Sequence, residues 1–173
     1  MAFTWIENEN NPSLVGPKVT LGLFAAGATQ AITLHTLLER TNTGNTIWVP
    51  IDSDHDATVT KLAVAAQAIA SGDPAGYYPI YEFRDGDVWE ADLAAASAIA
   101  PETALYYSSA TAVTVTAGTN IIAYSTQGLN HPGAQFRNSQ GQLGDKGVTY
   151  QSTNKVRLIF RTAVSSFSLK QRA

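Results

Sequence analysis

The chain has 173 residues, a net charge of −3 and no cysteine. Its length suits one domain with a substantial hydrophobic core, and the lack of cysteine excludes disulfide scaffolds, thiolate metal sites and cysteine nucleophiles. Only 14% of the residues are charged, whereas about a quarter is usual in globular proteins. A surface so poor in charge favours a component of an assembly, in which neighbouring subunits cover part of it, over a free monomer.

The charges are distributed unevenly along the chain. Residues 1–102 hold thirteen acidic and four basic side chains, a balance of −9, and residues 103–173 hold one acidic and seven basic side chains, a balance of +6. Such asymmetry suggests contact with nucleic acid or with a partner surface of opposite charge, including another copy of the chain. Alternatively, the fold mixes the two halves in space and the asymmetry has no functional meaning.

Residues 1–18 are polar and interrupted by proline, and they carry Phe3 and Trp5 near their start. We predict an N-terminal arm whose aromatic side chains dock on a partner. The alternative is a first edge strand whose aromatic residues complete the protein's own core. The opening residues lack the charged and apolar regions of a signal peptide, and no stretch approaches the roughly 20 apolar residues that a membrane span needs. We therefore expect synthesis in the cytoplasm and no membrane contact.

Residues 19–173 are predicted to form a single β domain. The stretch Lys18–Phe24 indicates a strand, and residues 32–49 predict a hairpin around an Asn- and Gly-containing turn at residues 42–45. Residues 59–69 are ambiguous, because their helix propensity is high although they lead into a strand-rich stretch. A strand is the preferred interpretation.

Two alternating runs, residues 77–83 and residues 88–93, flank an Asp-Gly turn at Asp85 and Gly86. Glycine tolerates the positive φ that such turns need, so the pattern predicts a β-hairpin. Successive side chains of a strand point to opposite faces. The predicted buried face of the second run consists of Trp89, Ala91 and Leu93, and the predicted wet face consists of Val88, Glu90 and Asp92.

The C-terminal part continues the β pattern. Residues 112–116 and 121–124 predict another strand pair, and residues 156–162 predict a final strand with Val156, Leu158 and Phe160 facing inward. Between them, residues 125–154 form a long loop insertion rich in Gly, Gln, Asn and Ser, of a length that is usually functional or disordered. The fold class we predict is all-β: a small β-barrel or β-sandwich of short antiparallel strands with an N-terminal arm and this long loop.

One dense cluster of potential metal ligands occurs, at residues 52–56. It begins like an EF-hand loop, but Ala57 stands where that motif has glycine and Ala63 stands where it has glutamate. The selective parts of the motif are missing, so a solvated acidic loop is favoured over a divalent-cation site.

Other catalytic patterns are weak. His35, His55 and His131 have no metal-ligand spacing, and no nucleophile elbow, P-loop or dinucleotide fingerprint occurs. Glu90 and Asp92 share one strand face and leave a hydrolase open as an alternative. We predict no catalytic residue, no metal and no cofactor. Because the sequence has no clustered basic face, we also expect no direct nucleic-acid contact.

Several segments resemble the small β-barrel module of tailed-phage head decoration (cement) proteins. They are the Gly-Asp-Pro turn and strand at residues 72–81, residues 85–89, residues 103–107 with the Val-Thr-Val-Thr run and residues 117–119, and the Val-Arg strand near residue 156. The resemblance covers roughly residues 60–124 and 155–162. Residues 1–58 and the insertion at 125–154 do not match the small version of that module.

The resemblance implies a virion structural protein, not an enzyme, that decorates and stabilises an icosahedral phage capsid by bridging neighbouring major capsid proteins. It implies a location on the outer capsid surface after synthesis in the host cytoplasm, and a homo-oligomer such as a trimer. Aromatic and Arg side chains are favoured interface anchors, so we predict partner contacts at Phe3, Trp5, Phe136 and Arg137. The alternatives are a tail or neck protein of the virion and a carbohydrate-binding β-sandwich that uses exposed Tyr and Trp.

Overall fold

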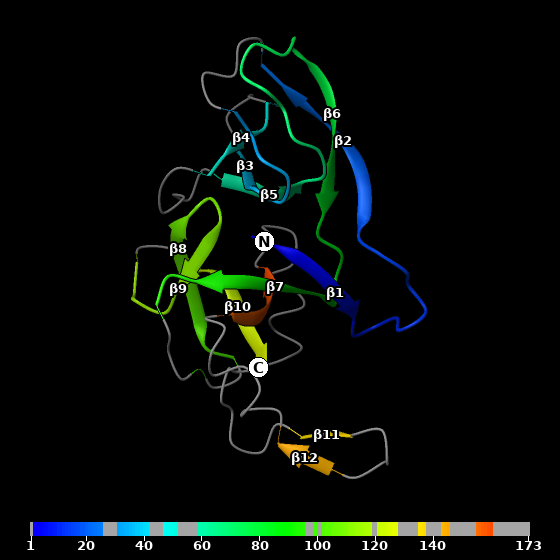
Figure 1. The fold of residues 1–173 in the computed structure, drawn as a ribbon, viewed down its shortest axis with the longest axis vertical. Helices are drawn as coiled ribbons and strands as arrows, with labels where there is room; N and C mark the ends of the chain where they lie inside the picture. Colours follow the sequence, from blue (N-terminus) through cyan, green and yellow to red (C-terminus); the bar gives the residue numbers. More distant parts are fainter. Residues whose placement is uncertain are drawn as a thin grey trace.

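The computed structural model describes residues 2–25, 31–41, 47–51, 59–95, 99, 102–118, 121–127, 135–137, 143–145 and 155–160. These residues form β-strands and their connections, arranged as a barrel, a second sheet beside it and a small two-stranded sheet (Figure 1). The predicted all-β fold with a small barrel is confirmed.

Five strands close the barrel in the order β7-β13-β10-β8-β9, and β9 returns to β7 in parallel. Their bounds are Asp87–Leu93 (β7), Ala104–Ser109 (β8), Ala112–Thr114 (β9), Ile121–Gln127 (β10) and Lys155–Phe160 (β13). An additional strand, β1 (Thr4–Asn8), pairs with the first half of β7, from Asp87 to Glu90. Closure leaves these barrel strands without long open edges.

The second sheet has the order β2-β6-β5-β3-β4. Its bounds are Lys18–Phe24 (β2), Leu37–Thr41 (β3), Val49–Pro50 (β4), Val59–Ala65 (β5) and Gly76–Glu82 (β6). The predicted strand at residues 18–24 is confirmed as β2. The predicted hairpin of residues 32–49 is confirmed for β3 and β4, which pair Leu38 with Pro50, but its first strand begins later than predicted, because residues 33–36 form a turn.

The core of the barrel continues onto one face of the second sheet. Trp89 and Leu158 of the barrel belong to the same buried cluster as Leu37, Leu62 and Val64 of β3 and β5. The opposite face of the sheet covers a second core. That core consists of Phe24, Ile32, Leu38, Trp48, Ala63, Ala65, Ile69 and Ile80.

Burial on both faces explains why β5 is a strand. Ala63, Val64 and Ala65 are all buried, and they lie between β3 and β6. Alanine has high helix propensity, but tertiary pairing overrides that weak preference. The preferred interpretation of residues 59–69 as a strand is confirmed for Val59–Ala65.

The predicted hairpin between residues 77–83 and 88–93 is wrong. The turn itself forms, because Gly86 has a φ of 80° and the Asp87 amide donates to the Arg84 carbonyl at 3.1 Å. However, β6 pairs with β2 and β5, whereas β7 pairs with β1, β13 and β9. The turn is a corner between two sheets, since other strands occupy both edges of β6 and β7.

The predicted pairing of residues 112–116 with residues 121–124 is also wrong. The strand β9 is short, and it pairs with β8 and β7, while β10 lies between β8 and β13. Alternation identified both segments as extended but did not specify their partners: β9 forms a tight hairpin with the preceding strand β8, and β10 pairs with β8 and with the distant β13.

The predicted inward faces are largely as expected. Trp89, Ala91 and Leu93 are buried, and so are Val156, Leu158 and Phe160. The correction is Val88, which is 1% exposed although it alternates with Trp89. Val88 pairs with Glu7 of β1, next to the irregularity in the β1–β7 register. Both faces of β7 are therefore buried at this point.

The prediction of a loop throughout residues 125–154 is wrong for three segments. The strand β10 continues to Gln127, and β11 (Gln135–Arg137) pairs with β12 (Leu143–Asp145). These two strands lie beyond the barrel at the bottom of Figure 1. The sequence offered no apolar alternation here, and short polar strands are the hardest to recognise from pattern alone.

Candidate interaction surface

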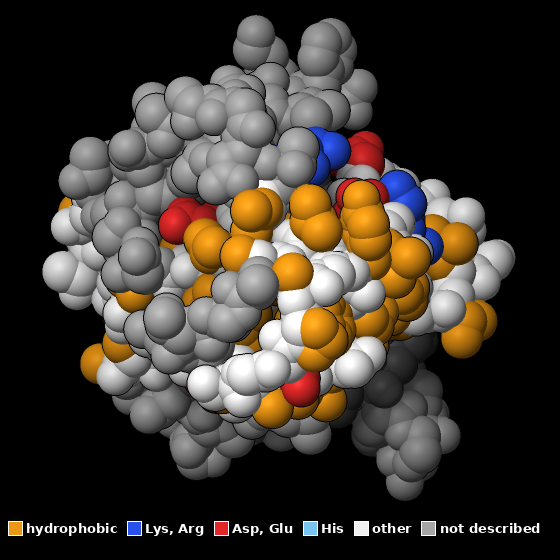
Figure 2. Space-filling model, turned by 90° about the horizontal axis from the view of Figure 1, so that it is seen from above, with side chains coloured by type: hydrophobic (Ala, Val, Ile, Leu, Met, Phe, Trp, Pro, Cys, Tyr) orange, Lys and Arg blue, Asp and Glu red, His pale blue; other side chains and the backbone are white. Residues whose placement is uncertain are grey.

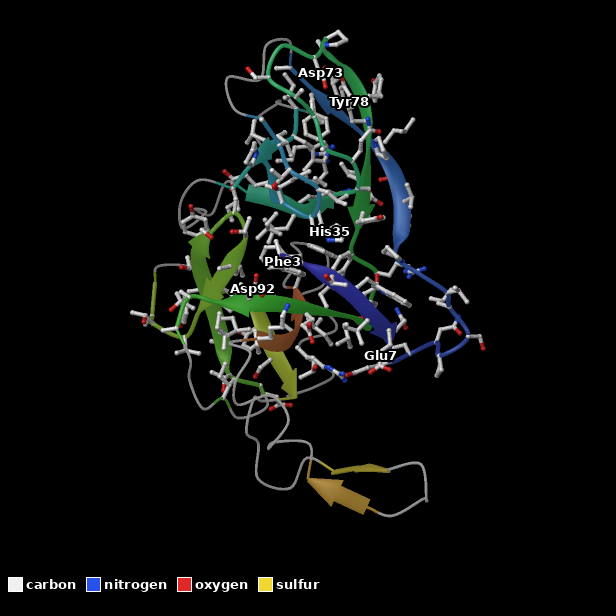
Figure 3. All side chains as sticks on the ribbon, in the orientation of Figure 1. Phe3, Glu7, His35, Asp73, Tyr78 and Asp92 are labelled. Atoms are coloured by element: carbon white, nitrogen blue, oxygen red, sulfur yellow. The ribbon has the colours of Figure 1, made fainter. Side chains whose placement is uncertain are left out.

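Phe3 is fully buried and belongs to the barrel core. Its ring packs against Phe160 with centroids 5.4 Å apart, and its amide hydrogen-bonds the His35 carbonyl at 3.4 Å. Figure 3 shows Phe3 and His35 near each other between the barrel and the second sheet. The prediction of a free arm is therefore wrong for residues 3–8, and the alternative of an edge strand that completes the core holds. Phe3 is inaccessible to a partner in this structure.

Trp5 is partly buried on β1, opposite Trp89 of β7. Its indole N–H donates to Asp87 Oδ1 at 3.0 Å. The side chain thus has a structural role in attaching β1 to the turn that precedes β7. A contact between its remaining exposed surface and a partner stays a prediction.

Asp87 is the centre of a buried polar network that fixes the N-terminal segment. It is 1% exposed, and its carboxylate accepts hydrogen bonds from Asn8 Nδ2 at 3.0 Å and from the Arg84 amide and Nε at 2.9 and 3.2 Å. Arg84 Nη2 also donates to the Gly16 carbonyl at 2.6 Å. A buried carboxylate is tolerated when it is paired and hydrogen-bonded in this way.

One indirect signal for this network is present in the sequence. The side-chain amides of Asn8 and Asn10 are hydrogen-bond donors, and the carboxylates of Asp87 and Asp85 are the acceptors. Asn10 Nδ2 donates to Asp85 Oδ2 at 3.1 Å. Asn8 and Asp87 are 79 residues apart in the sequence, so their pairing could not be predicted from the sequence. The effect is to hold the loop before β2 in place at both ends.

Phe136 and Arg137 lie on β11, where they pair with Gly144 and Leu143 of β12. Their side chains lie outside the described residues. Their predicted partner contacts therefore stay predictions.

Glu90 and Asp92 share one face of β7, as predicted. Lys155 of β13 lies beside them, a contact that the sequence pattern did not indicate. Lys155 Nζ lies 3.5 Å from Glu90 Oε1 and 3.1 Å from Asp92 Oδ1. Burial lowers the pKa of Lys155, but the hydrogen bonds and charges of Asp92 and Glu90 outweigh it, so the net pKa is raised. The three side chains form a charge-compensated cluster on the barrel wall.

His35 occupies a constrained position between the two sheets. Its φ is 67°, its amide donates to the Ala65 carbonyl at 2.9 Å, and its ring lies 6.2 Å from that of Tyr81. Burial lowers its pKa, and Nδ1 is buried with no hydrogen-bond partner in the described part of the chain. His55, His131 and the acidic cluster at residues 52–56 lie outside the described residues.

The described residues hold no group of three or more His, Cys, Asp or Glu side chains placed to bind a metal ion. Within the same residues, no helix has the length and apolar character to span a membrane.

Exposed hydrophobic side chains concentrate on one part of the second sheet. Val19 and Leu21 of β2 are 59% and 65% exposed, and Tyr77 of β6 is 68% exposed. The register pairs Val19 with Tyr81, Leu21 with Pro79 and Leu23 with Tyr77, so their side chains share a face. We call this the β2–β6 apolar face and define it by Val19, Leu21, Leu23, Tyr77 and Pro79. Seen from the end of the molecule at the top of Figure 1, hydrophobic side chains form a broad exposed area among the described residues (Figure 2).

Gly22 explains why β2 turns its aliphatic residues outward. A Cβ at Gly22 would lie 2.5 Å from Trp48 Cδ1, so only glycine lets β2 approach the indole. Gly22 and Phe24 therefore face the second core, and Val19, Leu21 and Leu23 take the opposite face. The Val-x-Leu-x-Leu pattern by itself gave no sign that these residues are the outer ones.

No family model matches this chain, and neither does any curated protein or solved structure.

Proposed function

We propose that this protein is a virion structural protein that decorates and stabilises an icosahedral phage head. It would lie on the outer capsid surface, bridge neighbouring major capsid proteins and act as a homo-oligomer, in line with the trimer that the resemblance implies. The proposal assigns it no catalytic residue, metal or cofactor. The resemblance of residues 60–124 and 155–162 to head decoration proteins supports it.

The observation that carries the proposal is the β2–β6 apolar face. Of the six large hydrophobic side chains that are markedly exposed among the described residues, Val19, Leu21 and Tyr77 belong to it, and Val15 precedes it in the chain at 99% exposure. Monomeric soluble proteins rarely expose large contiguous apolar patches unless these bind something. An exposed aromatic residue among aliphatic neighbours is a typical interface composition.

The hydrogen-bonded N-terminal segment also fits a structural role. The Asp87 network fixes the loop before β2 through Arg84 and Gly16, so little order must be acquired when a partner docks. Many copies on one shell would bind with high avidity even if each contact were weak.

The test uses purified protein and empty phage heads assembled without it. We expect the wild-type protein to sediment with the heads and to raise their melting temperature. Tyr77→Lys, which places a charge in the β2–β6 apolar face, should weaken binding at least tenfold. Val49→Lys is the matched control, because Val49 is 41% exposed on β4, and it should bind like the wild type. Failure of the wild-type protein to bind heads would refute the proposal.

A further inference from the structure

The outer edge of β2 is open over two residues. Pro79 of β6 has no N–H, and its carbonyl accepts from the Ala66 amide on the β5 side at 3.2 Å. In an antiparallel pair, residues alternate between facing the partner strand and facing away from it. Leu21, which pairs with Pro79, therefore directs its own N–H and C=O away from β6, and so do Val19 and Leu23.

Leu23 already has a partner for its outward carbonyl, because the Trp48 amide donates to it at 2.8 Å. Pro17 bounds the edge on the other side and has no N–H to offer. Within the described residues no strand covers the outward groups of Val19 and Leu21. The free edge thus consists of two N–H and two C=O groups.

Between Val19 and Leu23, this edge lacks the usual protection against strand addition. Natural edge strands carry charged residues, proline or bulges that prevent pairing with another chain. The seven residues of β2 pair with β6 in an unbroken register, and Val19 and Leu21 are aliphatic and exposed. The charge on Lys18 is compensated by Glu82 at 2.8 Å.

We infer that the edge of β2 binds the same edge of a second copy, as an antiparallel pair about a two-fold axis at Thr20. Val19 of each copy would then lie opposite Leu21 of the partner copy, and all the free backbone groups would be paired. The side chains of these residues would meet on one face as two aliphatic cross-strand pairs.

The charges and side-chain sizes favour self-pairing. Lys18 would lie opposite Gly22 of the partner copy, which has no side chain, and its own ion pair with Glu82 would remain intact. No two like charges of the strand would face each other. Pairing would end where Pro17 and the occupied Leu23 carbonyl end the free edge, so the self-complementary segment has a defined length.

The contact is small, whereas stable dimers bury about 800 Å² per partner. It is therefore expected to be weak in dilute solution and to form where copies are concentrated. The inference deepens the self-association of the proposed function and rests on it, since a decorated shell would supply that concentration. A two-fold contact would join copies of neighbouring oligomers.

Cross-linking through Thr20 tests the register directly. In the proposed pair, Thr20 residues oppose each other at a non-hydrogen-bonded site, where Cα atoms are about 4.5 Å apart, within the range of a disulfide. The chain has no native cysteine, so Thr20→Cys has a single thiol. We expect it to form disulfide dimers at least tenfold faster under mild oxidation than Val15→Cys, an exposed control off the edge. Equal rates would overturn the inference.

A second pair of variants tests the edge without a thiol. Leu21→Lys should weaken the concentration-dependent self-association seen in sedimentation at least tenfold, and Val15→Lys, with the same change of charge, should leave it unchanged. Equal effects of the two variants would overturn self-pairing.

Head binding separates this inference from the proposed function. One outcome would overturn self-pairing in favour of pairing with a strand of the capsid. In that outcome the protein binds heads, Thr20→Cys cross-links slowly, and the Val19 and Leu21 amides are protected from hydrogen exchange only on heads. Fast cross-linking without head binding would support self-pairing and refute the decoration role.

Discussion

The barrel and the β2–β6 part of the second sheet differ in their strand edges and in their exposed surfaces. The barrel closes on itself through the parallel pairing of β9 with β7, and on its wall Lys155 contacts two carboxylates. In contrast, no strand in the described part of the chain covers the edge of β2 at Val19 and Leu21, and these two side chains are exposed. The difference indicates that one region supplies stability and the other is available for contacts, so variants in each should have separable effects.

The largest effect on stability is expected in the barrel. Trp89→Ala removes a side chain that is 1% exposed and contacts Phe83 and Phe160, and it should lower the free energy of unfolding by about 3–5 kcal/mol. Tyr77→Ala, at the exposed face, should change it by less than about 0.5 kcal/mol. Urea unfolding followed by tryptophan fluorescence or circular dichroism measures both. Similar losses would contradict the division between the two regions.

The next largest effect concerns the junction at the N-terminal segment. Asp87→Ala leaves the partly buried Arg84 and the amide of Asn8 without their carboxylate partner, and breaking a buried ion pair in this way costs about 3 kcal/mol. Hydrogen exchange of β1 should also accelerate. Asp85→Ala, which removes an exposed hydrogen bond to Asn10, is the control and should have a small effect. An unchanged β1 in Asp87→Ala would show that the network does not hold this strand.

A smaller loss of folding stability is expected when a side chain is added at Gly22, between β2 and the second core. Gly22→Ala places a Cβ 2.5 Å from Trp48 Cδ1, and overpacking of this kind costs about 1–3 kcal/mol. Gly76→Ala on β6 meets no atom within 4 Å and is the matched control. Denaturant titration of both variants gives the comparison, and equal stability would show that the Trp48 ring moves aside freely.

The smallest changes in the free energy of unfolding are expected when the ion pairs of Lys155 and Lys18 are removed. The raised pKa of Lys155 means that its stabilising contribution is complete below the unfolded pKa of about 10.5 and is lost as the pH rises through the folded pKa. Lys155→Met should therefore cost about 0.2–1 kcal/mol near pH 7, and the difference from the wild type should shrink in strong alkali. A difference that grows with pH would contradict this assignment.

The opposite pH dependence is expected at the edge of the second sheet. The hydrogen bond from Lys18 is the main cause of the lowered pKa of Glu82, so this pair stabilises the protein above the unfolded pKa of about 4.5, and the contribution is lost in acid. Lys18→Met should remove this acid-sensitive component without altering the alkaline one. Unfolding curves between pH 3 and pH 7 provide the test.

Most of the strands, and the inward side of most of them, could be predicted from the sequence alone, with β11 and β12 as exceptions. Alternation placed Trp89, Leu93 and Leu158 inward, and the Asp-Gly pair located the turn at Gly86, as the structure confirms. These are local properties, since side-chain direction along a strand and the φ of a turn depend on neighbouring residues.

The pairing of the strands and the set of exposed side chains became clear from the tertiary structure and not from the sequence. The tertiary structure separated β6 from β7, buried Phe3 and brought Asn8 to Asp87. It also turned Val19 and Leu21 outward, because Trp48 fills the space beside Gly22. Pairing and burial depend on contacts between residues that are tens of positions apart, and a strand's own pattern specifies a face to be buried but not the partner that buries it.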